Sequence, residues 1–446
     1  MNELIAKFEI YLHHLVTARR VNFYEFKNFL EPSFAKFGYR TPPKIGEKLN
    51  VLIIHDAAIG DFVLLSGAIR EFRRLYPSAH ITLVANIGSL TLAEHCPYVD
   101  ELLQNEQKYN TSALDQLYYW NLSFARKLWT RPYHICYAFI HRPNTALLTY
   151  MSGAQLRFAH PSEEVMKTFV LNFDDTAPFD DFNSNVLFKV SIDILSTNIL
   201  SMYTFGGHIV DTHFSFVDHA LKVPVANREL ELWYTPLELF DAKNFLVNAR
   251  RPIYILGMGG REHRKHYPPE RYAKLVEMIL HEEPTTTFVI LGGGVDDAKS
   301  AQILKENLDE KIFAEHVIDL TNKTSYRVSA AILTMCDMYI GNDTGIMHVA
   351  AAAKCPVLCV NCFPADLPHN RADYVRFFSP YHVPSVTIQP AHALPECAVN
   401  APYNPYGCRM GDAHCINQIE VEKVFNGWKI LLGRIAEKNI EPFFSE

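Results

Sequence analysis

Short apolar strands alternate with helices along most of this chain, and this alternation restricts the fold more than any other feature. The run Val51–Ile54 is apolar at every position, so both faces of the strand are expected to be buried, as in a parallel sheet. An amphipathic helix is predicted over Gly60–Tyr76, followed by strands over Ile81–Val84 and Ile135–Ile140. This order is typical of βαβ units, so the first half is predicted to be a doubly wound domain.

The alternation begins again after Pro252. A helix is predicted over Pro269–His281, and strands are predicted over Ile253–Leu256, Phe288–Leu291, Val317–Leu320, Met338–Ile340 and Val357–Val360. The proline-containing segment Leu221–Arg251 separates the two sets. Two doubly wound domains that face each other would form a central cleft at the carboxyl ends of both sheets, where ligands bind in such folds.

The predicted organisation is therefore α/β, with two Rossmann-like domains preceded by a helical appendage. Helical spacing of apolar residues in the first forty positions predicts the appendage, whose role is either packing or attachment to a membrane surface or another subunit. A C-terminal helix is also predicted, with packing against the first domain as one option. The boundaries are 1–44 for the appendage, 45–222 for the first domain, 223–251 for the junction, 252–425 for the second domain and 426–446 for the last helix.

Composition and charge exclude several classes of protein. The 446 residues carry 42 Lys and Arg against 49 Asp and Glu, a net charge of −7 that argues against general nucleic-acid binding. No apolar stretch is long enough to span a bilayer, and the first residues lack the apolar core of a signal peptide. We therefore expect a cytoplasmic protein whose nine cysteines are reduced.

The segment Gly341–His348 is the strongest indication of a binding site. It follows a predicted strand and precedes the Ala-rich run Val349–Ala353. A helix that begins here exposes backbone N–H groups at the positive end of its dipole, which favours a phosphate or another anion. Thr344 could add a hydroxyl to such a site and His348 a ring N–H. The alternative is an ordinary Asp or Thr N-cap.

A second strand-to-helix turn, Asp56–Asp61, lies in the first domain. Asp61 falls in the first turn of the predicted helix, where a carboxylate is favoured by the helix dipole. It is a candidate general base that would accept a proton from an incoming hydroxyl. The alternative role is again helix capping.

A third turn, Gly257–Pro269, ends another predicted strand and carries several possible cations. Next to an anion site, these cations would neutralise charge that develops on a departing diphosphate. The glycines match a dinucleotide-binding fingerprint only in part, because the third glycine of that spacing is absent.

These turns, in this order, resemble glycosyltransferase family 9, whose best-known members are the ADP-heptose:lipopolysaccharide heptosyltransferases. The resemblance runs from about Asn50 to Phe425. It rests on four segments, which are Gly60-Asp61 with Tyr76-Pro77, Lys265-His266-Tyr267-Pro268, Asp319–Ser325 and Gly341–His348. The chain departs from the family pattern at His55-Asp56, at Gly67 and at Ile346.

The resemblance implies a GT-B fold in which the second domain binds a nucleotide-sugar donor and the first domain binds the acceptor. It implies that Asp61 is the catalytic base and that Lys265 binds the donor phosphates. The other donor-binding candidates are Gly259, Gly292, Asp343, Thr344, Gly345 and His348, and the acceptor-binding candidates are Gly60 and Arg142. No metal and no further cofactor are expected, because the helix dipole and nearby cations take the role of a metal in GT-B enzymes.

The implied reaction is an inverting transfer of a sugar, with heptose from ADP-heptose as the first choice, onto a glycan such as the lipopolysaccharide core. Two alternatives stay open, which are transfer to a protein hydroxyl and a non-catalytic protein that binds nucleotide sugars or serves assembly. The expected partners are the donor and a glycan or lipid-linked acceptor, without nucleic acid. Peripheral contact with the inner face of the inner membrane is an option.

Two groups of residues are weaker candidates for a metal site. Unliganded thiols are expected at Cys362, Cys397, Cys408 and Cys415, because these four form no Cys-x-x-Cys pair with one another. Some protein-modifying heptosyltransferases that resemble this family carry a cysteine-bound iron, which is the alternative. Solvated loop carboxylates, rather than a metal–diphosphate site, are expected at Asp174-Asp175 and Asp180-Asp181.

Overall fold

The computed structural model describes most of the chain outside its first 48 residues. The described residues are 49–55, 57–105, 131–139, 207–221, 224–366, 375–395 and 412–445, with short pieces at 124, 127–128, 145, 148–149, 152–154, 156–159 and 198–199. No helix within these ranges is both long and apolar enough to cross a membrane. The cytoplasmic location stays a prediction.

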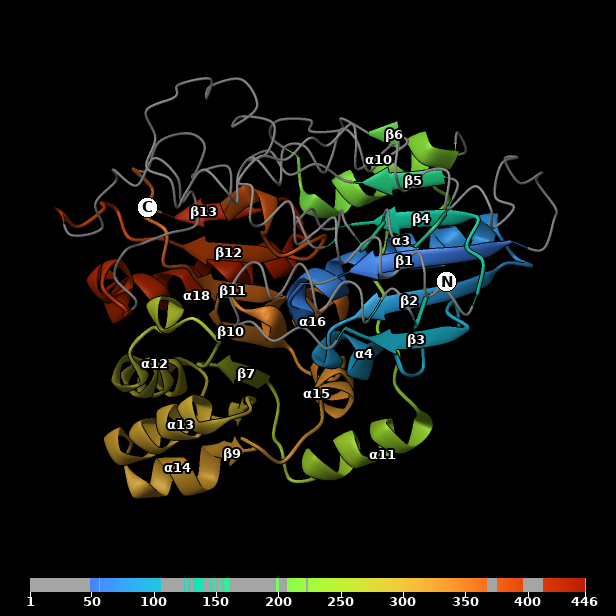
Figure 1. The fold of residues 1–446 in the computed structure, drawn as a ribbon. Helices are drawn as coiled ribbons and strands as arrows, with labels where there is room; N and C mark the ends of the chain where they lie inside the picture. The colour runs from blue at the N-terminus through green and yellow to red at the C-terminus, as the bar shows by residue number, and fades with distance from the viewer. Residues whose placement is uncertain are drawn as a thin grey trace, which may run out of the picture.

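The first domain is built on a six-stranded sheet with the order β3-β2-β1-β4-β5-β6, in which every pair is parallel (Figure 1). Its strands are β1 Asn50–His55, β2 His80–Ala85, β3 Glu101–Gln104, β4 Ile135–Ala138, β5 Leu156–Ala159 and β6 Asn198–Ile199. Its helices are α3 Ile59–Leu75, α4 Ile87–Ala93 and α10 Ile209–Leu221. The three strands predicted in this half are confirmed as β1, β2 and β4.

The second domain is built on a seven-stranded parallel sheet with the order β13-β12-β11-β10-β7-β8-β9. Its strands are β7 Ile253–Gly257, β8 Thr287–Ile290, β9 Val317–Asp319, β10 Met338–Asn342, β11 Val357–Val360, β12 Ser385–Ile388 and β13 Phe443–Ser445. Its helices are η2 His263–Lys265, α12 Pro269–Glu282, α13 Val295–Asn307, α14 Glu310–His316, α15 Tyr326–Leu333, α16 Gly345–Ala352, η4 Cys415–Gln418 and α18 Val421–Ala436. All five strands predicted in this half are confirmed.

Burial explains why these segments take these forms. In α3 the predicted apolar stripe is fully buried, and Phe62, Leu65, Ile69 and Phe72 are each at most 1% exposed. The central strand β1 pairs with β2 on one side and with β4 on the other, so its side chains are covered on both faces. The apolar runs in the sequence therefore correspond to segments that are buried in the core of each domain.

The junction between the domains is hydrogen-bonded to α3. Its helix α11 spans Pro236–Phe245, and the segment before it runs along α3. The buried carboxylate of Glu71 accepts a hydrogen bond from the backbone of Ala226 at 3.0 Å. At Gly67, an added Cβ would lie 2.5 Å from the carbonyl oxygen of Glu229. The departure from the family pattern at Gly67 therefore makes room for the junction.

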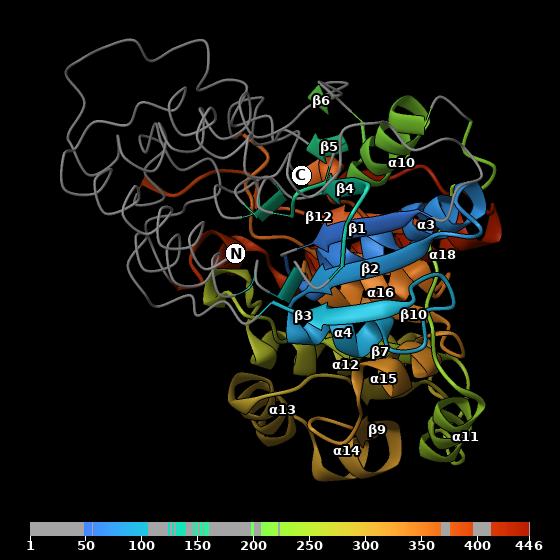
Figure 2. The ribbon, with the colours of Figure 1, turned by 45° about the vertical axis from the view of Figure 1, so that its right-hand side comes forward.

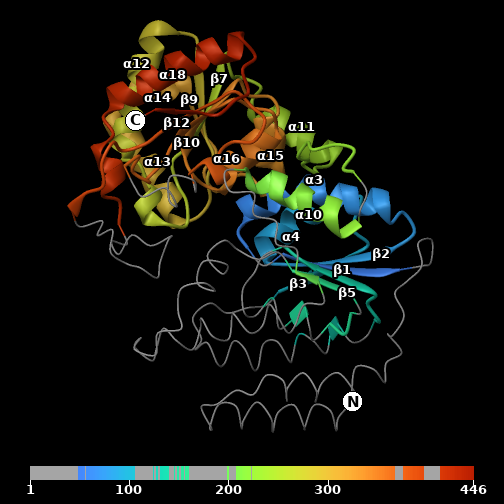
Figure 3. The same ribbon diagram turned by 90° about the horizontal axis from the view of Figure 1, so that it is seen from above.

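The two domains meet through their helices rather than through their sheets. The helix α16 of the second domain packs against α3 of the first, and α15 packs against α4 and α11. Figure 3 shows α3, α4, α15 and α16 between the two sheets, and in Figure 2 α11 lies to one side, at the lower right. Two parallel α/β domains that face each other in this way confirm the predicted architecture.

The C-terminal helix packs within the second domain. The predicted helix over residues 426–446 is α18, which begins earlier, at Val421, and packs against α12, β11 and β12. It therefore belongs to the second domain rather than packing on the first, and β13 follows it at the edge of the second sheet. The N-terminal appendage lies outside the described residues.

Candidate functional site

The start of α16 is the centre of the candidate site. The strand β10 ends at Asn342, and the helix begins at Gly345 after an N-cap, Thr344, in extended conformation. The side chain of Thr344 makes no capping hydrogen bond to any described residue. The alternative of an ordinary Thr cap is therefore not realised, and the amides of the first turn remain a binding element for an anion.

Asn342 fixes this turn against the loop that follows β7. Its buried side chain accepts hydrogen bonds from the backbone N–H of Tyr267 at 3.2 Å and from the Tyr272 hydroxyl at 2.9 Å. Its amide also donates to the carbonyl groups of Met258 and Gly259. No local sequence pattern indicates this role of Asn342, because its partners lie far away in the chain.

Lys265 and Asp343 form an ion pair at the start of α16. The Nζ atom of Lys265 lies 3.0 Å from Oδ2 of Asp343 and 3.1 Å from its carbonyl oxygen. The two side chains are 14% and 7% exposed. Burial alone would raise the pKa of Asp343, but the charge of Lys265 and the nearby His348 hold that pKa below its usual value. The structure thus brings two predicted donor-binding residues together, and Asp343 positions the ammonium group.

His348 projects from the first turn of α16 into the domain contact. Its side chain is only 6% exposed, and burial lowers its pKa to about 4, so the ring is neutral near pH 7. Among the described residues, its Nδ1 atom has no hydrogen-bond partner. A neutral ring has one N–H donor and one acceptor nitrogen, which suits a polar ligand in a buried site.

The Gly60-Asp61 turn approaches α16 from the other domain. A Cβ on Gly60 would lie 2.7 Å from Cδ2 of His348 and 3.0 Å from Cα of Gly345, so the close approach needs glycine at this position. Asp61 follows directly, and its Oδ2 atom accepts a hydrogen bond from the backbone N–H of Ala58 at 3.1 Å. The capping role that was the alternative for Asp61 is therefore present in this structure.

Gly259 and Gly292 surround the carboxylate of Asp297, which is not among the predicted site residues. Added Cβ atoms on these glycines would lie 1.3 and 2.6 Å from the carboxylate oxygens of Asp297. The same carboxylate accepts a hydrogen bond from the backbone of Gly293 at 2.5 Å, and burial raises its pKa. An acidic first turn after three glycines was the signal in the sequence. Asp297 therefore links the turns after β7 and β8.

Two other cations of the loop after β7, Arg264 and His266, have partners within that loop. Arg264 pairs with Glu262 and lies over the ring of Phe363, with 5.1 Å from Cζ to the ring centroid. His266 contacts the carbonyl oxygen of Gly260 at 2.7 Å. Of the loop side chains predicted to neutralise a diphosphate, Lys265 is the one held at the start of α16.

Some of the remaining candidate residues lie within the described part of the chain and others do not. Arg142, both aspartate pairs, Cys397 and Cys408 lie outside the described residues, whereas Cys362 and Cys415 are buried and form no disulfide with a described cysteine. In the part of the chain that is described, no group of three His, Cys, Asp or Glu residues could hold a metal ion.

The chain is similar in sequence to known heptosyltransferases. The family described as glycosyltransferase family 9 (heptosyltransferase) matches residues 195–361. Lipooligosaccharide heptosyltransferase 2 of Haemophilus influenzae is 29% identical over 124 residues, which are 28% of this chain and only 35% of that protein. Lipopolysaccharide heptosyltransferase 2 of Escherichia coli is 21% identical over 341 residues, which are 75% of this chain and 90% of that protein.

A solved structure shares the fold. The ADP-heptose lipopolysaccharide heptosyltransferase II of E. coli superimposes with a TM-score of 0.59 and 16% identity, over 87% of this chain and 100% of that chain. At this identity the likeness concerns the fold, and it confirms the predicted GT-B arrangement. The motifs, the sequence matches and the fold agree, and together they show that this chain is similar to the family 9 glycosyltransferases.

Proposed function

We propose that this protein transfers a sugar from a nucleoside diphosphate sugar, with ADP-heptose as the first candidate, to a hydroxyl of a glycan such as the lipopolysaccharide core. The observation that carries the proposal is the contact between two helix starts from different domains. On one side, α16 begins without a capping Thr side chain and has Lys265 beside it. On the other side, Gly60 touches Gly345 and is followed by the carboxylate of Asp61.

The donor diphosphate would bind at the start of α16. Backbone N–H groups of the first turn would donate to the phosphate oxygens, where the helix dipole favours negative charge. Lys265 would move from its contacts with Asp343 toward the diphosphate, over a short distance because Asp343 already holds it there. His348, neutral in this environment, would donate its ring N–H.

Asp61 would act as the general base of an inverting transfer. The acceptor oxygen attacks the anomeric carbon from the face opposite the diphosphate, and the bond from that carbon to the phosphate oxygen breaks. The hydroxyl proton passes to Asp61, and the electron pair leaves with the nucleoside diphosphate, whose charge Lys265 and the α16 amides stabilise. Asp61 would exchange its hydrogen bond with the Ala58 amide for one to the acceptor hydroxyl.

A transfer without a metal ion is part of the proposal, because a helix start and a lysine supply the positive charge that the leaving group needs. We further propose that the reaction takes place on the cytoplasmic side of the inner membrane, where a lipid-linked acceptor would be reached from the surface.

A donor screen tests the proposal. ADP-, UDP- and GDP-linked sugars are titrated into the full chain by calorimetry, and the donors that bind are then incubated with candidate acceptors. We expect an ADP-linked sugar to bind and nucleotide release to depend on the acceptor, with equal rates in EDTA. Mass analysis of the product separates a glycan acceptor from a protein hydroxyl. Donor binding without acceptor-dependent release would instead support the non-catalytic alternative.

A further inference from the structure

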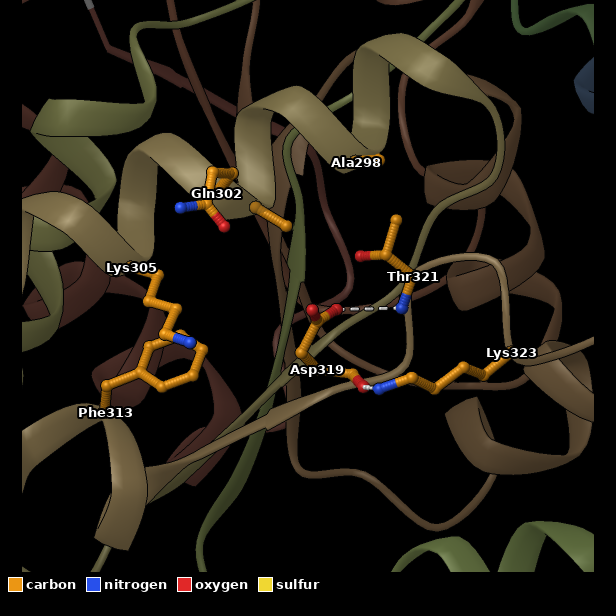
Figure 4. A pocket seen from close by; sticks show the side chains of 8 residues that line it. Ala298, Gln302, Lys305, Phe313, Asp319, Thr321 and Lys323 are labelled. Carbon is orange, nitrogen blue, oxygen red and sulfur yellow. Dashed lines mark hydrogen bonds between the residues drawn. The ribbon is translucent and has the colours of Figure 1, made fainter. Parts of the chain in front are cut away.

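A cavity lies on the second domain, away from the domain contact. It is about 440 Å³ in volume and opens between α13, α14 and the end of β9 (Figure 4). This volume falls within the range of roughly 300–1,000 Å³ that is usual for small-molecule sites. Its lining residues come from α13, from α14 and from the segment after β9, and they are Ala298, Ala301, Gln302, Lys305, Phe313, Asp319, Thr321 and Lys323.

The cavity contains a buried hydroxyl without a partner. Thr321 is only 8% exposed, and its Oγ1 atom has no hydrogen-bond partner among the described residues. Figure 4 shows this oxygen on the side of Thr321 that faces the cavity. Leaving a buried hydroxyl unpaired is unfavourable, so the arrangement favours a ligand group that pairs with it.

The charges of the lining residues indicate the class of ligand. Lys305 and Lys323 bring two positive charges from opposite sides, whereas Asp319 brings one negative charge (Figure 4). Among the described residues, the Lys323 ammonium group donates to the carbonyl oxygen of Asp319 at 2.6 Å, and Nζ of Lys305 lies 5.4 Å from the ring centroid of Phe313. Both lysines can therefore donate further hydrogen bonds to an anion. Asp319 and Gln302 suit hydroxyl groups of a ligand. The Asp319 carboxylate can accept a hydrogen bond from a hydroxyl, and the Gln302 amide can accept or donate one.

The cavity is separate from the proposed diphosphate site. In the sheet, β7 and β8 lie between β10 and β9, so the start of α16 is about 14 Å away at the usual strand spacing. Asn322 also hydrogen-bonds the segment after β9 to the glycine turn after β8. Its Oδ1 accepts from the backbone N–H of Gly294 at 2.6 Å, and its own N–H donates to Gly292 at 3.0 Å.

We propose that this cavity is a second ligand site, which takes a small phosphorylated sugar or polyol. Lys305 and Lys323 bind the phosphate, while Thr321, Gln302 and Asp319 bind hydroxyl groups. Because Asn322 lies between Thr321 and Lys323 and holds the Gly292–Gly294 turn, an occupied cavity stiffens the turn that surrounds Asp297. Binding at this site does not depend on the proposed transfer reaction, since it is measured without donor or acceptor.

Calorimetry on the full chain tests this site with glucose 6-phosphate, ribose 5-phosphate, glucose and inorganic phosphate as probes. We expect at least one sugar phosphate to bind about tenfold or more tightly than glucose or phosphate alone, because only the ester engages both sets of groups. Thr321→Val should weaken that binding about tenfold without lowering the unfolding midpoint, since it removes only an unpaired hydroxyl.

Lys305→Ala should weaken sugar-phosphate binding by a similar factor. Lys299→Ala is the matched control, because Lys299 is exposed on the same helix but does not line the cavity. Three results would overturn the proposal. The first is the absence of sugar-phosphate binding at millimolar concentration. The second is sugar-phosphate binding by the Thr321 and Lys305 variants that is as tight as that of the wild type. The third is displacement of the sugar phosphate by ADP, which would make the cavity the nucleoside end of the donor site.

Discussion

Two helices begin at the contact between the domains, and their first turns are satisfied in opposite ways. In α3, the chain supplies its own anion, because the Asp61 carboxylate accepts a hydrogen bond from the Ala58 amide. At the start of α16, the carboxylate of Asp343 is turned toward Lys265. The side chain of the N-cap residue, Thr344, makes no capping hydrogen bond to the described residues. Similar strand-to-helix turns thus differ in whether the anion belongs to the protein or must come from a ligand.

This difference assigns separate tasks to the two domains. The turn with its own carboxylate has a group that can accept a proton, and the turn without one has free positive potential for a diphosphate. Glycines at both turns allow the two tasks to meet, since Gly60 contacts Gly345 and His348. The following predictions test this division.

Replacement of the α3 carboxylate should have the largest effect. Asp61→Asn keeps the size of the side chain but removes the base, so we expect kcat to fall by roughly 10²- to 10⁴-fold. The affinity for the donor, measured by calorimetry, should be unchanged, because that turn does not bind the diphosphate.

Asp309→Asn is the control for this variant, because Asp309 caps the outlying helix α14 and accepts from the backbone of Lys311 at 2.9 Å. It should lower stability slightly and leave kcat unchanged. Wild-type turnover by Asp61→Asn would show that this carboxylate only caps its helix.

Removal of the α16 cation should act on binding and on stability together. Lys265→Met leaves Asp343 buried without its partner, which is expected to cost about 3–5 kcal/mol of unfolding free energy. It should also weaken ADP binding by about 100-fold, in line with the loss of a charge-assisted hydrogen bond.

The double variant Lys265→Met/Asp343→Asn separates these two effects. Because it buries no uncompensated charge, stability in urea unfolding should largely return, while ADP binding stays weak. Recovery of ADP binding together with stability would mean that Lys265 serves only the fold.

Stability measured as a function of pH tests the difference between the two turns through His348, which belongs to the α16 turn. Burial lowers its folded pKa to about 4, whereas an unfolded histidine titrates near 6.5. Between these values the unfolded state binds more protons, so the stability contributed by the neutral ring is full above pH 6.5 and is lost as the pH falls toward 4. The expected loss is about 2–3 kcal/mol.

His348→Gln should remove this part of the pH dependence in thermal unfolding. His208 has a pKa lowered by burial to about 4 as well, so it contributes a second slope of the same sign that remains in the variant. An identical pH profile in wild type and variant would contradict the burial of a neutral ring at position 348.

Widening the contact between the two turns should have the smallest effect. Gly60→Ala places a methyl group against His348 and Gly345, so we expect kcat to fall about tenfold while ADP affinity changes little. Gly433→Ala is a matched helical control, because nothing lies within 4 Å of an added Cβ there. Steady-state kinetics of both variants measure the difference, and equal kcat values would show that the contact is not needed for turnover.

The sequence predicted the interior of the fold well, because central strands of parallel sheets are apolar on both faces. It missed β5, β6 and the buried strand β12. It also missed β3, whose residues are at most partly buried, and β13, which is three residues long at a sheet edge. Such edge strands carry weak periodicity, so pairing with a neighbour decides their form.

The candidate site was predicted as a set of turns but not as a set of contacts. Gly341–His348 and Lys265 are brought together as the motifs suggested. The roles of Asn342 and Asp297 could not be predicted, because their partners come from other strands of the sheet. Gly60 was expected near the acceptor, and its contact with Gly345 depends on how the domains meet, which no local pattern encodes.

The central claim is that the backbone at the start of α16 holds the diphosphate of the donor. A crystal structure of the protein with ADP tests it most directly. We predict phosphate oxygens at about 2.7–3.2 Å from the backbone nitrogens of Gly345 and Ile346, with Lys265 turned from Asp343 toward them. A diphosphate bound elsewhere, with the Lys265–Asp343 pair intact and the α16 turn empty, would contradict the claim.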